Sequence, residues 1–411
     1  MSRKLLVTNC HLIDSGERET IPDFLFAESA PAPVSAKRLA DVLVTDGVIS
    51  RVSRTRLPAD DAAVLDAGGR TLVPGFIDVH IQGAGGADVL DGTPESLRAI
   101  SRTCARYGAT SFLATSVYRP GGDNGHLRVA AEHTERDLGG ARLLGIHLEG
   151  PFIAPARAGM IRPDSICSPS ERVFAGVLDA TQGCLRMMTL APELAGCLDI
   201  VWKLVRRGIV ASFGHSDASY EETRASIAAG VSHVTHLFNV MPGMHHRHPG
   251  PIAAILTDSK ITAQVIADGV HLHPAILKLA FSLLGSDRCV TITDGIQALG
   301  LGDGTYTYNG EEYESLAGTP RYRDGTLIGT SLGLSEILPR LMLFTKCSLA
   351  DAVKTVTANP ARVLGMEHRK GAVEEGKDGD LVLLDQDRSV FATVVSGAVV
   401  YGKDRGPQSS A

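Results

Sequence analysis

Hydrophobic and polar positions follow two different rhythms along the chain. Up to about residue 73, short alternating runs such as Lys4–Thr8 and Val48–Val52 are separated by turn pairs such as Asp46-Gly47, which predicts β-strands. From Pro74 onward, short apolar runs alternate with longer amphipathic segments, which indicates βα units around a parallel sheet. About eight such units in roughly 250 residues are typical of a (β/α)8 TIM barrel. The expected barrel strands are Phe76–His80, Thr110–Thr115, Leu143–Glu149, Met187–Ala191, Val210–His215, His233–Leu237, Thr262–Ala267 and Val290–Thr293.

The C-terminal part of the chain departs from this rhythm. Residues 303–328 look like a hairpin excursion, and two helical segments follow at Ser331–Phe344 and Leu349–Val363. The tail returns to a β pattern at Asp380–Leu384 and Thr393–Val400. We therefore expect residues 1–73 and 365–411 to form one small β-sandwich domain beside a barrel of residues 74–364. The segment AESAPAPVSAKR is expected to be a surface loop or a disordered insert.

Composition narrows the class of protein and its compartment. Hydrophobic residues make up 44% and charged residues 21%, which is ordinary for a soluble globular protein. The net charge of −6 argues against a nucleic-acid partner. The seven cysteines include no Cys-x-x-Cys pair, and no apolar run approaches the roughly 18 residues of a membrane span. The N-terminal apolar run is too short for a signal peptide, so we expect a cytoplasmic protein with reduced thiols and no membrane partner.

Polar side chains with metal-binding or acid–base chemistry recur where the expected barrel strands end. One such residue alone is commonly just solvated, but agreement at five strand ends favours a shared site, because reactive groups of a TIM barrel gather at that face. Several buried imidazoles and carboxylates are also unfavourable together unless they are paired or bind a cation. The candidates are Asp78 and His80, His147 and Glu149, His215, His236, and Asp294.

Ordered motifs make the interpretation specific. The segments PGFIDVHIQGAGG, GIHLEGPF, GHSDASY, THLFNVMPGMHHRHPG, ADGVHLH and TDG, followed by DGTLIGTSL, TANPARVLG and GDLVLLD, occur in one order over most of the chain. In these motifs the chain resembles the N-acetylglucosamine-6-phosphate deacetylase family. The resemblance implies metal-dependent hydrolysis of the N-acetyl group of an amino-sugar phosphate, most simply N-acetylglucosamine 6-phosphate. It also implies that Glu149, His215 and His236 ligate a divalent metal and that Asp294 is the general base and acid.

The implied ligand set suits a catalytic metal, because one carboxylate and two imidazoles leave a coordination position open. Zn is the first choice, and such ligands also accept Fe or Mn. For Asp294 the alternative is a structural acceptor that holds a histidine ligand in place.

The resemblance also implies residues for the substrate. Asn239 and His271 match positions that contact the phosphosugar. Arg247 matches an arginine that binds phosphate, often across a dimer interface, so we expect a homodimer. Charge-assisted hydrogen bonds from an arginine and a histidine suit a phosphate monoester.

Two positions depart from the family pattern. Many metal-rich relatives carry His-x-His after the first strand, whereas this chain has His80 and Gln82. Because Gln is a weak neutral ligand, we expect one tight metal and at most a weak second site at His80 and Gln82. A substrate-contacting histidine usual in the family is replaced by Ile161, so Arg157, Arg162 or a loop histidine would have to substitute, or the substrate differs.

Two alternatives therefore stay open. One is an amidohydrolase for a non-phosphorylated N-acyl amino sugar or another N-acyl substrate. Hydantoinase-like enzymes are disfavoured because the fourth strand, RMMTLAPE, lacks a lysine, and deaminases usually keep His-x-His. The other is a non-catalytic barrel that binds a sugar phosphate.

Overall fold

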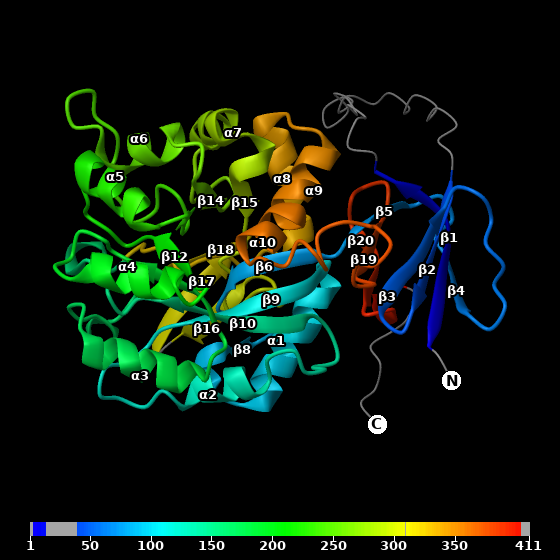
Figure 1. Cartoon of the computed structure of the whole chain (residues 1–411), viewed down its shortest axis with the longest axis horizontal. Helices are drawn as coiled ribbons and strands as arrows, with labels where there is room; N and C mark the ends of the chain where they lie inside the picture. Colours follow the sequence, from blue (N-terminus) through cyan, green and yellow to red (C-terminus); the bar gives the residue numbers. More distant parts are fainter. Residues whose placement is uncertain (1–2, 14–38, 309, 404–411) are drawn as a thin grey trace.

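The computed structural model describes residues 3–13, 39–308 and 310–403. Figure 1 shows a barrel with its surrounding helices beside a smaller body of β-structure that contains both ends of the described chain. The expected Ala/Pro/Ser-rich loop, residues 27–38, lies outside the described residues.

The barrel is formed by parallel strands that pair in chain order. It closes where Gly295, just past the last strand, bridges to Ile81, and where the backbone N–H of Asp294 donates to the carbonyl of His80 at 2.9 Å. The predicted (β/α)8 barrel is therefore confirmed. Its strands in the described part of the chain are β6 (Phe76–Ile81), β9 (Ala109–Ser116), β10 (Arg142–Glu149), β11 (Leu185–Leu190), β12 (Val210–Phe213), β13 (His233–Val234), β14 (Thr262–Val265) and β15 (Cys289–Thr291).

Helices cover the outside of the barrel (Figure 1). Their starts follow local sequence signals: α1 begins with Pro94 after Thr93, whose side chain accepts the N–H of Ser96. The expected helix Leu349–Val363 is interrupted at Thr357, whose φ of −130° and ψ of −82° are not helical, so it forms two helices. The helices are α1 (Pro94–Arg106), α2 (Gly125–Glu132), α3 (Glu171–Thr181), α4 (Cys197–Val205), α5 (Tyr220–Ala229), α6 (Gly250–Thr257), α7 (Pro274–Arg288), α8 (Leu334–Thr345), α9 (Leu349–Val356) and α10 (Ala358–Val363).

The barrel interior holds an apolar core that includes Ile77, Leu144, Met187 and Ile292, and Ala361 in α10 packs against it. Burying these side chains removes apolar surface from water, which is the dominant favourable term in folding. The polar candidate site residues lie beyond this core, at the ends of the strands.

The N- and C-terminal segments pair with one another, as predicted. β5 and β19 are antiparallel neighbours in which Leu72 lies opposite Leu383, and the core of this smaller body draws on both segments. The division at residues 73/74 and 364/365 stays a prediction. The strands are β1 (Lys4–Leu12), β2 (Ala40–Thr45), β3 (Val48–Ser53), β4 (Ala63–Asp66), β5 (Thr71–Pro74), β19 (Leu381–Leu384), β20 (Val390–Val395) and β21 (Ala398–Gly402).

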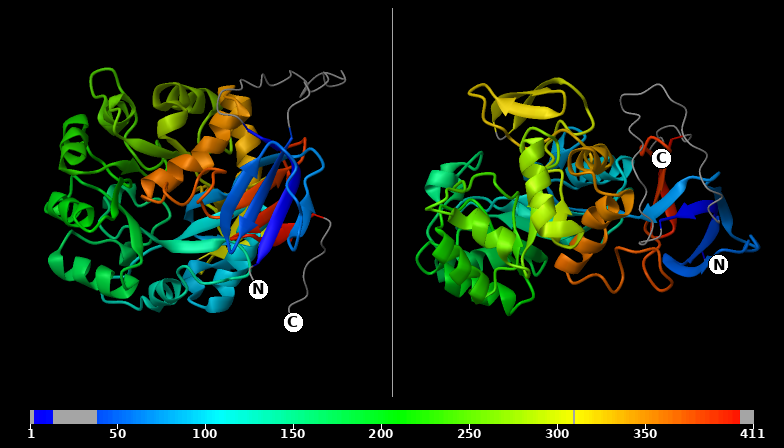
Figure 2. Two further views of the ribbon diagram at one scale, coloured as in Figure 1. Left: turned by 45° about the vertical axis from the view of Figure 1, so that its right-hand side comes forward. Right: turned by 90° about the horizontal axis from the view of Figure 1, so that it is seen from above.

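Residues 303–328 form more than the expected hairpin. β16 (Gly304–Tyr308), β17 (Glu311–Leu316) and β18 (Thr319–Tyr322) make an antiparallel sheet, drawn in yellow at one side of the barrel in the right-hand view of Figure 2. Tyr308 and Tyr313 bury their rings against Ile296 and Ile328. This excursion therefore packs directly on the segment that follows β15. A short hairpin, β7 (Gly83–Ala84) and β8 (Ala87–Asp88), follows β6.

The described ranges contain no helix with the length and apolar character needed to cross a membrane. All seven cysteines are free thiols, and five of them are buried.

Candidate metal centre

Three of the predicted site residues converge at the mouth of the barrel. Glu149 ends β10, and His215 and His236 follow the ends of β12 and β13. Oε1 of Glu149 lies 3.0 Å from Nε2 of His215 and 3.1 Å from Nε2 of His236, and the two Nε2 atoms are 3.1 Å apart. All three residues are buried. Their donor atoms thus form a nearly equilateral triangle.

This triangle fits a cation. The Nδ1 atom of His215 lies 2.8 Å from the carbonyl oxygen of Arg157. Because a carbonyl only accepts, Nδ1 carries the proton, and Nε2 of a neutral ring presents a lone pair to the carboxylate. Two acceptors at that distance repel each other unless a cation or a proton lies between them. Ligand bonds of about 2.0–2.2 Å place tetrahedral Zn²⁺ ligands about 3.3–3.6 Å apart, a few tenths of an ångström more than the observed separations.

The backbone of the site is unusual. His215, His236 and Asp294 have φ values of 49°, 27° and 49°, in the left-handed region that non-glycine residues rarely adopt. Such residues cost about 1–3 kcal/mol each and persist where the surroundings fix them, often at functional sites. The same conformation explains why β12, β13 and β15 end before these residues, although the sequence predicted that the strands include or reach them.

Asp294 borders the triangle through His80. Oδ1 of Asp294 lies 3.2 Å from Nε2 of His80, which is 3.6 Å from Oε1 of Glu149. The side-chain N–H of Gln82 points to the same Asp294 oxygen at 3.4 Å. The structure therefore brings the expected general base, the expected ligands and the two residues of the possible second metal position into one cluster.

The electrostatics of the cluster favour an ionised Glu149. Burial alone would raise the pKa of this carboxyl, but the positive charge of the neighbouring His80 holds the pKa well below its usual range. Burial also opposes a charge on His80, yet Asp294 and Glu149 raise its pKa to about 9. Burial lowers the pKa of His236. An anionic carboxylate beside a neutral imidazole is the protonation state that cation binding needs.

The predicted substrate residues lie in different surroundings. The Asn239 amide donates to the carbonyl of His236 at 3.2 Å, so this residue is anchored beside the triangle. The Nδ1 atom of His271 lies 2.7 Å from Oδ2 of Asp268, and the imidazole is 5% exposed. Arg247 is exposed on the loop where His245 and His248 pair, which leaves its guanidinium open to an anion. Their roles stay predictions.

The loop that carries Ile161 packs against the triangle. A Cβ built on Gly159 would lie 3.5 Å from the His215 ring, and Ile161 itself is buried. Arg157 and Arg162, the expected substitutes for the missing histidine, form ion pairs with Asp217 and Glu311 at 2.8 and 3.9 Å. Arg157 is therefore held by a carboxylate in this arrangement.

Two residues of the site escaped the sequence analysis. Oε1 of Gln264 lies 3.0 Å from Nδ1 of His80 and accepts the backbone N–H of His236 at 3.3 Å. Tyr308 donates its hydroxyl to Oε1 of Gln82 at 2.7 Å. Gln264 could have been found from the sequence, because it is a polar residue inside the otherwise mostly apolar expected strand Thr262–Ala267. Tyr308 gave no such signal, because it lies outside the barrel repeat.

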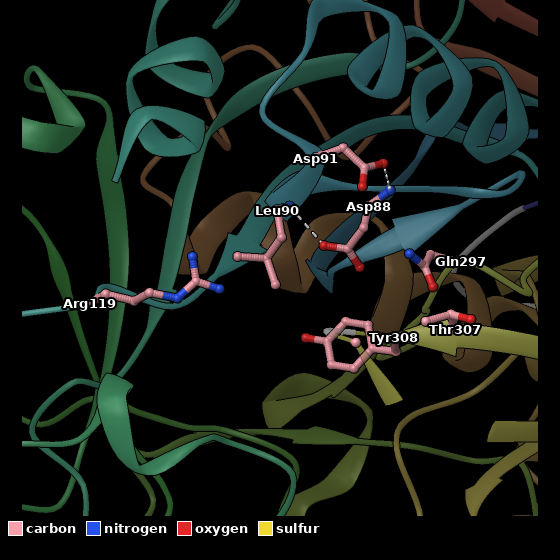
Figure 3. A pocket seen from close by; sticks show the side chains of 8 residues that line it. Asp88, Leu90, Asp91, Arg119, Gln297, Thr307 and Tyr308 are labelled. Carbon is pink, nitrogen blue, oxygen red and sulfur yellow. Dashed lines mark hydrogen bonds between the residues drawn. The ribbon is translucent and has the colours of Figure 1, made fainter. Parts of the chain in front are cut away.

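A cavity of about 330 Å³ lies beside Tyr308, whose hydroxyl contacts Gln82. Figure 3 shows Asp88, Leu90 and Gln297 around it together with Tyr308, and Arg119 approaching from the opposite side.

A (β/α)8 barrel with a carboxylate and two imidazoles converging at its mouth is the arrangement of a metal-dependent hydrolase, and residues 71–400 match the amidohydrolase family. The N-acetylglucosamine-6-phosphate deacetylase of Bacillus subtilis (strain 168) is 38% identical over 364 residues, which cover 87% of this chain and 92% of that protein. The N-acetylgalactosamine-6-phosphate deacetylase of Escherichia coli O157:H7 is 33% identical, with coverages of 86% and 93%.

A solved structure agrees. A variant of the Mycobacterium smegmatis N-acetyl-D-glucosamine-6-phosphate deacetylase, in complex with N-acetyl-D-glucosamine-6-phosphate, superposes with a TM-score of 0.84 at 30% identity. It covers 97% of this chain and 99% of its own. The chain belongs to the N-acetylglucosamine-6-phosphate deacetylase family of amidohydrolases, which confirms the resemblance seen in the sequence motifs.

Proposed function

We propose that this protein hydrolyses the acetamide of N-acetylglucosamine 6-phosphate to glucosamine 6-phosphate and acetate. The observation that carries the proposal is the buried triangle of Glu149 Oε1, His215 Nε2 and His236 Nε2, with the Asp294 carboxylate beside it. The family of the chain supports the substrate.

Glu149, His215 and His236 would hold one divalent cation, with Zn²⁺ as the first choice and Fe or Mn as alternatives. A cation of this kind supplies a water of lowered pKa, about 7 for zinc, and polarises the amide carbonyl. His80 and Gln82 remain candidates for a weak second position.

Asp294 is the proton carrier in this mechanism. Its carboxylate takes a proton from water as a new C–O bond forms at the acetyl carbon. It then delivers that proton to the sugar nitrogen as the C–N bond breaks, so acetate and a free amine leave. Its place between His80 and Gln82 orients the carboxylate for both steps.

The phosphosugar end is assigned to Asn239, His271 and Arg247. The exposed Arg247 suits a phosphate monoester because a guanidinium binds it through paired charge-assisted hydrogen bonds. We propose a homodimer, in which Arg247 serves the neighbouring subunit, and a cytoplasmic location.

An acetate-release assay on N-acetylated gluco, galacto and manno sugars, each with and without a 6-phosphate, tests the proposal. We expect the highest kcat/KM for N-acetylglucosamine 6-phosphate. The buried, apolar Ile161 favours the alternative of a phosphate-free N-acyl substrate, and equal kcat/KM with and without phosphate would support it. No acetate from any sugar would support the non-catalytic barrel.

A further inference from the structure

The side-chain amide of Gln82 lies between Asp294 and a tyrosine from outside the barrel repeat. Its Nε2 is 3.4 Å from Oδ1 of Asp294, and its Oε1 is 2.7 Å from the hydroxyl of Tyr308. Gln82 is 5% exposed and Tyr308 is 5% exposed, so both contacts are shielded from water.

The Asp294 carboxylate determines which end of the Gln82 amide faces it. A carboxylate oxygen accepts hydrogen bonds, so the amide must present its N–H to Asp294. The opposite orientation would set the Gln82 carbonyl against the carboxylate, two acceptors facing each other. With the N–H committed to Asp294, Oε1 needs a donor, and the Tyr308 hydroxyl supplies it.

Tyr308 is fixed in place by its own sheet. It ends β16, and its ring belongs to a buried cluster with Ile296, Tyr313 and Ile328. The Tyr308 side chain also lines the cavity shown in Figure 3, next to Leu90. The excursion of residues 303–328 thus delivers one hydroxyl group to the metal centre.

We propose that Tyr308 is a positioning residue that holds the Gln82 amide with its N–H toward Asp294 and keeps the Gln82 carbonyl oxygen away from a second metal ion. The inference rests on the proposed function, in which Asp294 carries the proton. The sheet of residues 303–328 would then have a role in the reaction. Through Tyr308 and Gln82 it would limit the site to one cation and orient the Asp294 carboxylate.

A double-mutant cycle tests the coupling. We compare the wild-type chain, Tyr308→Phe, Gln82→Ala and the double variant. Tyr306→Phe is the matched control, because the Tyr306 hydroxyl lies in the same strand and donates to the Gly302 carbonyl just before β16. Tyr308→Phe should lower kcat about tenfold with KM changed less than about twofold. In the Gln82→Ala background the same change should alter kcat less than about twofold, since the intermediary is gone. A full tenfold loss in that background would overturn the proposal.

Zinc stoichiometry, measured by elemental analysis after dialysis against excess Zn²⁺, is the second readout. Tyr308→Phe removes the donor that holds the Gln82 oxygen, so the amide can turn this oxygen toward Asp294 and the variant should take up a second equivalent of zinc. The wild-type chain, Tyr306→Phe and the double variant should hold one. One equivalent in Tyr308→Phe would overturn the claim that Tyr308 withholds this oxygen. Failure of the proposed function is distinguishable, because the wild-type chain would then bind no zinc or release no acetate.

Discussion

The Oε1 atom of Gln264 lies 3.0 Å from Nδ1 of His80, and both side chains are fully buried. The same oxygen accepts the backbone N–H of His236 at 3.3 Å. One amide therefore fixes the ring orientation of one residue of the cluster and the backbone of another, which is how residues behind a metal site tune its ligands.

Replacing Gln264 should weaken cation binding without touching a proposed ligand. Gln264→Leu removes the acceptor and leaves Nδ1 of His80 buried and unpaired, so we expect zinc affinity to fall about 10–100-fold. Gln264→Glu keeps an acceptor oxygen and should bind more tightly than the leucine variant. Competition with a zinc chelator measures both, and equal affinity of Gln264→Leu and the wild-type chain would contradict this role.

Asp294→Asn separates binding from proton transfer. The amide is close to the size of the carboxylate but cannot take a proton, so we expect zinc content and melting temperature to stay near wild type. The value of kcat should fall by about 10²–10⁴-fold, the range of general acid–base contributions. Turnover within a factor of about two of wild type would instead assign Asp294 to holding His80.

Arg247→Ala tests the phosphate assignment. Loss of the exposed guanidinium should raise KM for N-acetylglucosamine 6-phosphate at least about tenfold and change kcat little, because the phosphate is remote from the reacting amide. Arg247→Lys keeps the charge without the paired donors, so its KM should lie between the two. An unchanged KM in Arg247→Ala would favour the phosphate-free substrate.

The stability of the fold should depend on the buried ion pairs of Lys370 with Asp378 and Asp380, just before β19. The ammonium of Lys370 lies 2.6 Å from Asp380 and 2.9 Å from Asp378, and its side chain is 4% exposed. Lys370→Met leaves the buried carboxylate of Asp380 without its ammonium partner, whereas Asp378 keeps its ion pair with Arg369. The free energy of unfolding should therefore fall by about 3–5 kcal/mol in urea titrations at neutral pH. A change below about 1 kcal/mol would contradict the assignment.

The same ion pair predicts a pH dependence. Burial opposes the charge of Lys370, but Asp380 and Asp378 outweigh it and raise the pKa. Its contribution to stability is therefore complete below the unfolded pKa of about 10.4 and is lost as pH rises through the higher folded value. Burial likewise opposes the charge of Asp378, but Lys370 lowers its pKa, so that contribution is present above about pH 3.9 and is lost as pH falls through the lower folded value. Urea titrations of the wild-type chain and Lys370→Met across pH should show the difference narrowing at both extremes.

Local patterns explain why the barrel and its candidate ligands could be predicted from the sequence. Strand rhythm is set by neighbouring residues, and the barrel rule then gathers residues such as Glu149, His215 and His236 at one face. The left-handed backbone of His236 and Asp294 could not be predicted, because the surrounding fold imposes it.

Contacts between distant segments explain what the sequence analysis missed. Gln264 meets His80 across 184 positions, and Tyr308 meets Gln82 across 226. Neither pairing leaves a periodic signal, since it depends on how the barrel closes and where the excursion of residues 303–328 folds back. The third strand of that excursion was missed for the same reason.

Zinc bound per chain is the measurement that tests the central claim most directly. Elemental analysis of the purified protein after dialysis at limiting zinc should give about one equivalent for the wild-type chain and less than about a tenth for Glu149→Ala, which loses the one carboxylate of the triangle. Equal zinc in both proteins, or none in either, would contradict a cation held by Glu149, His215 and His236.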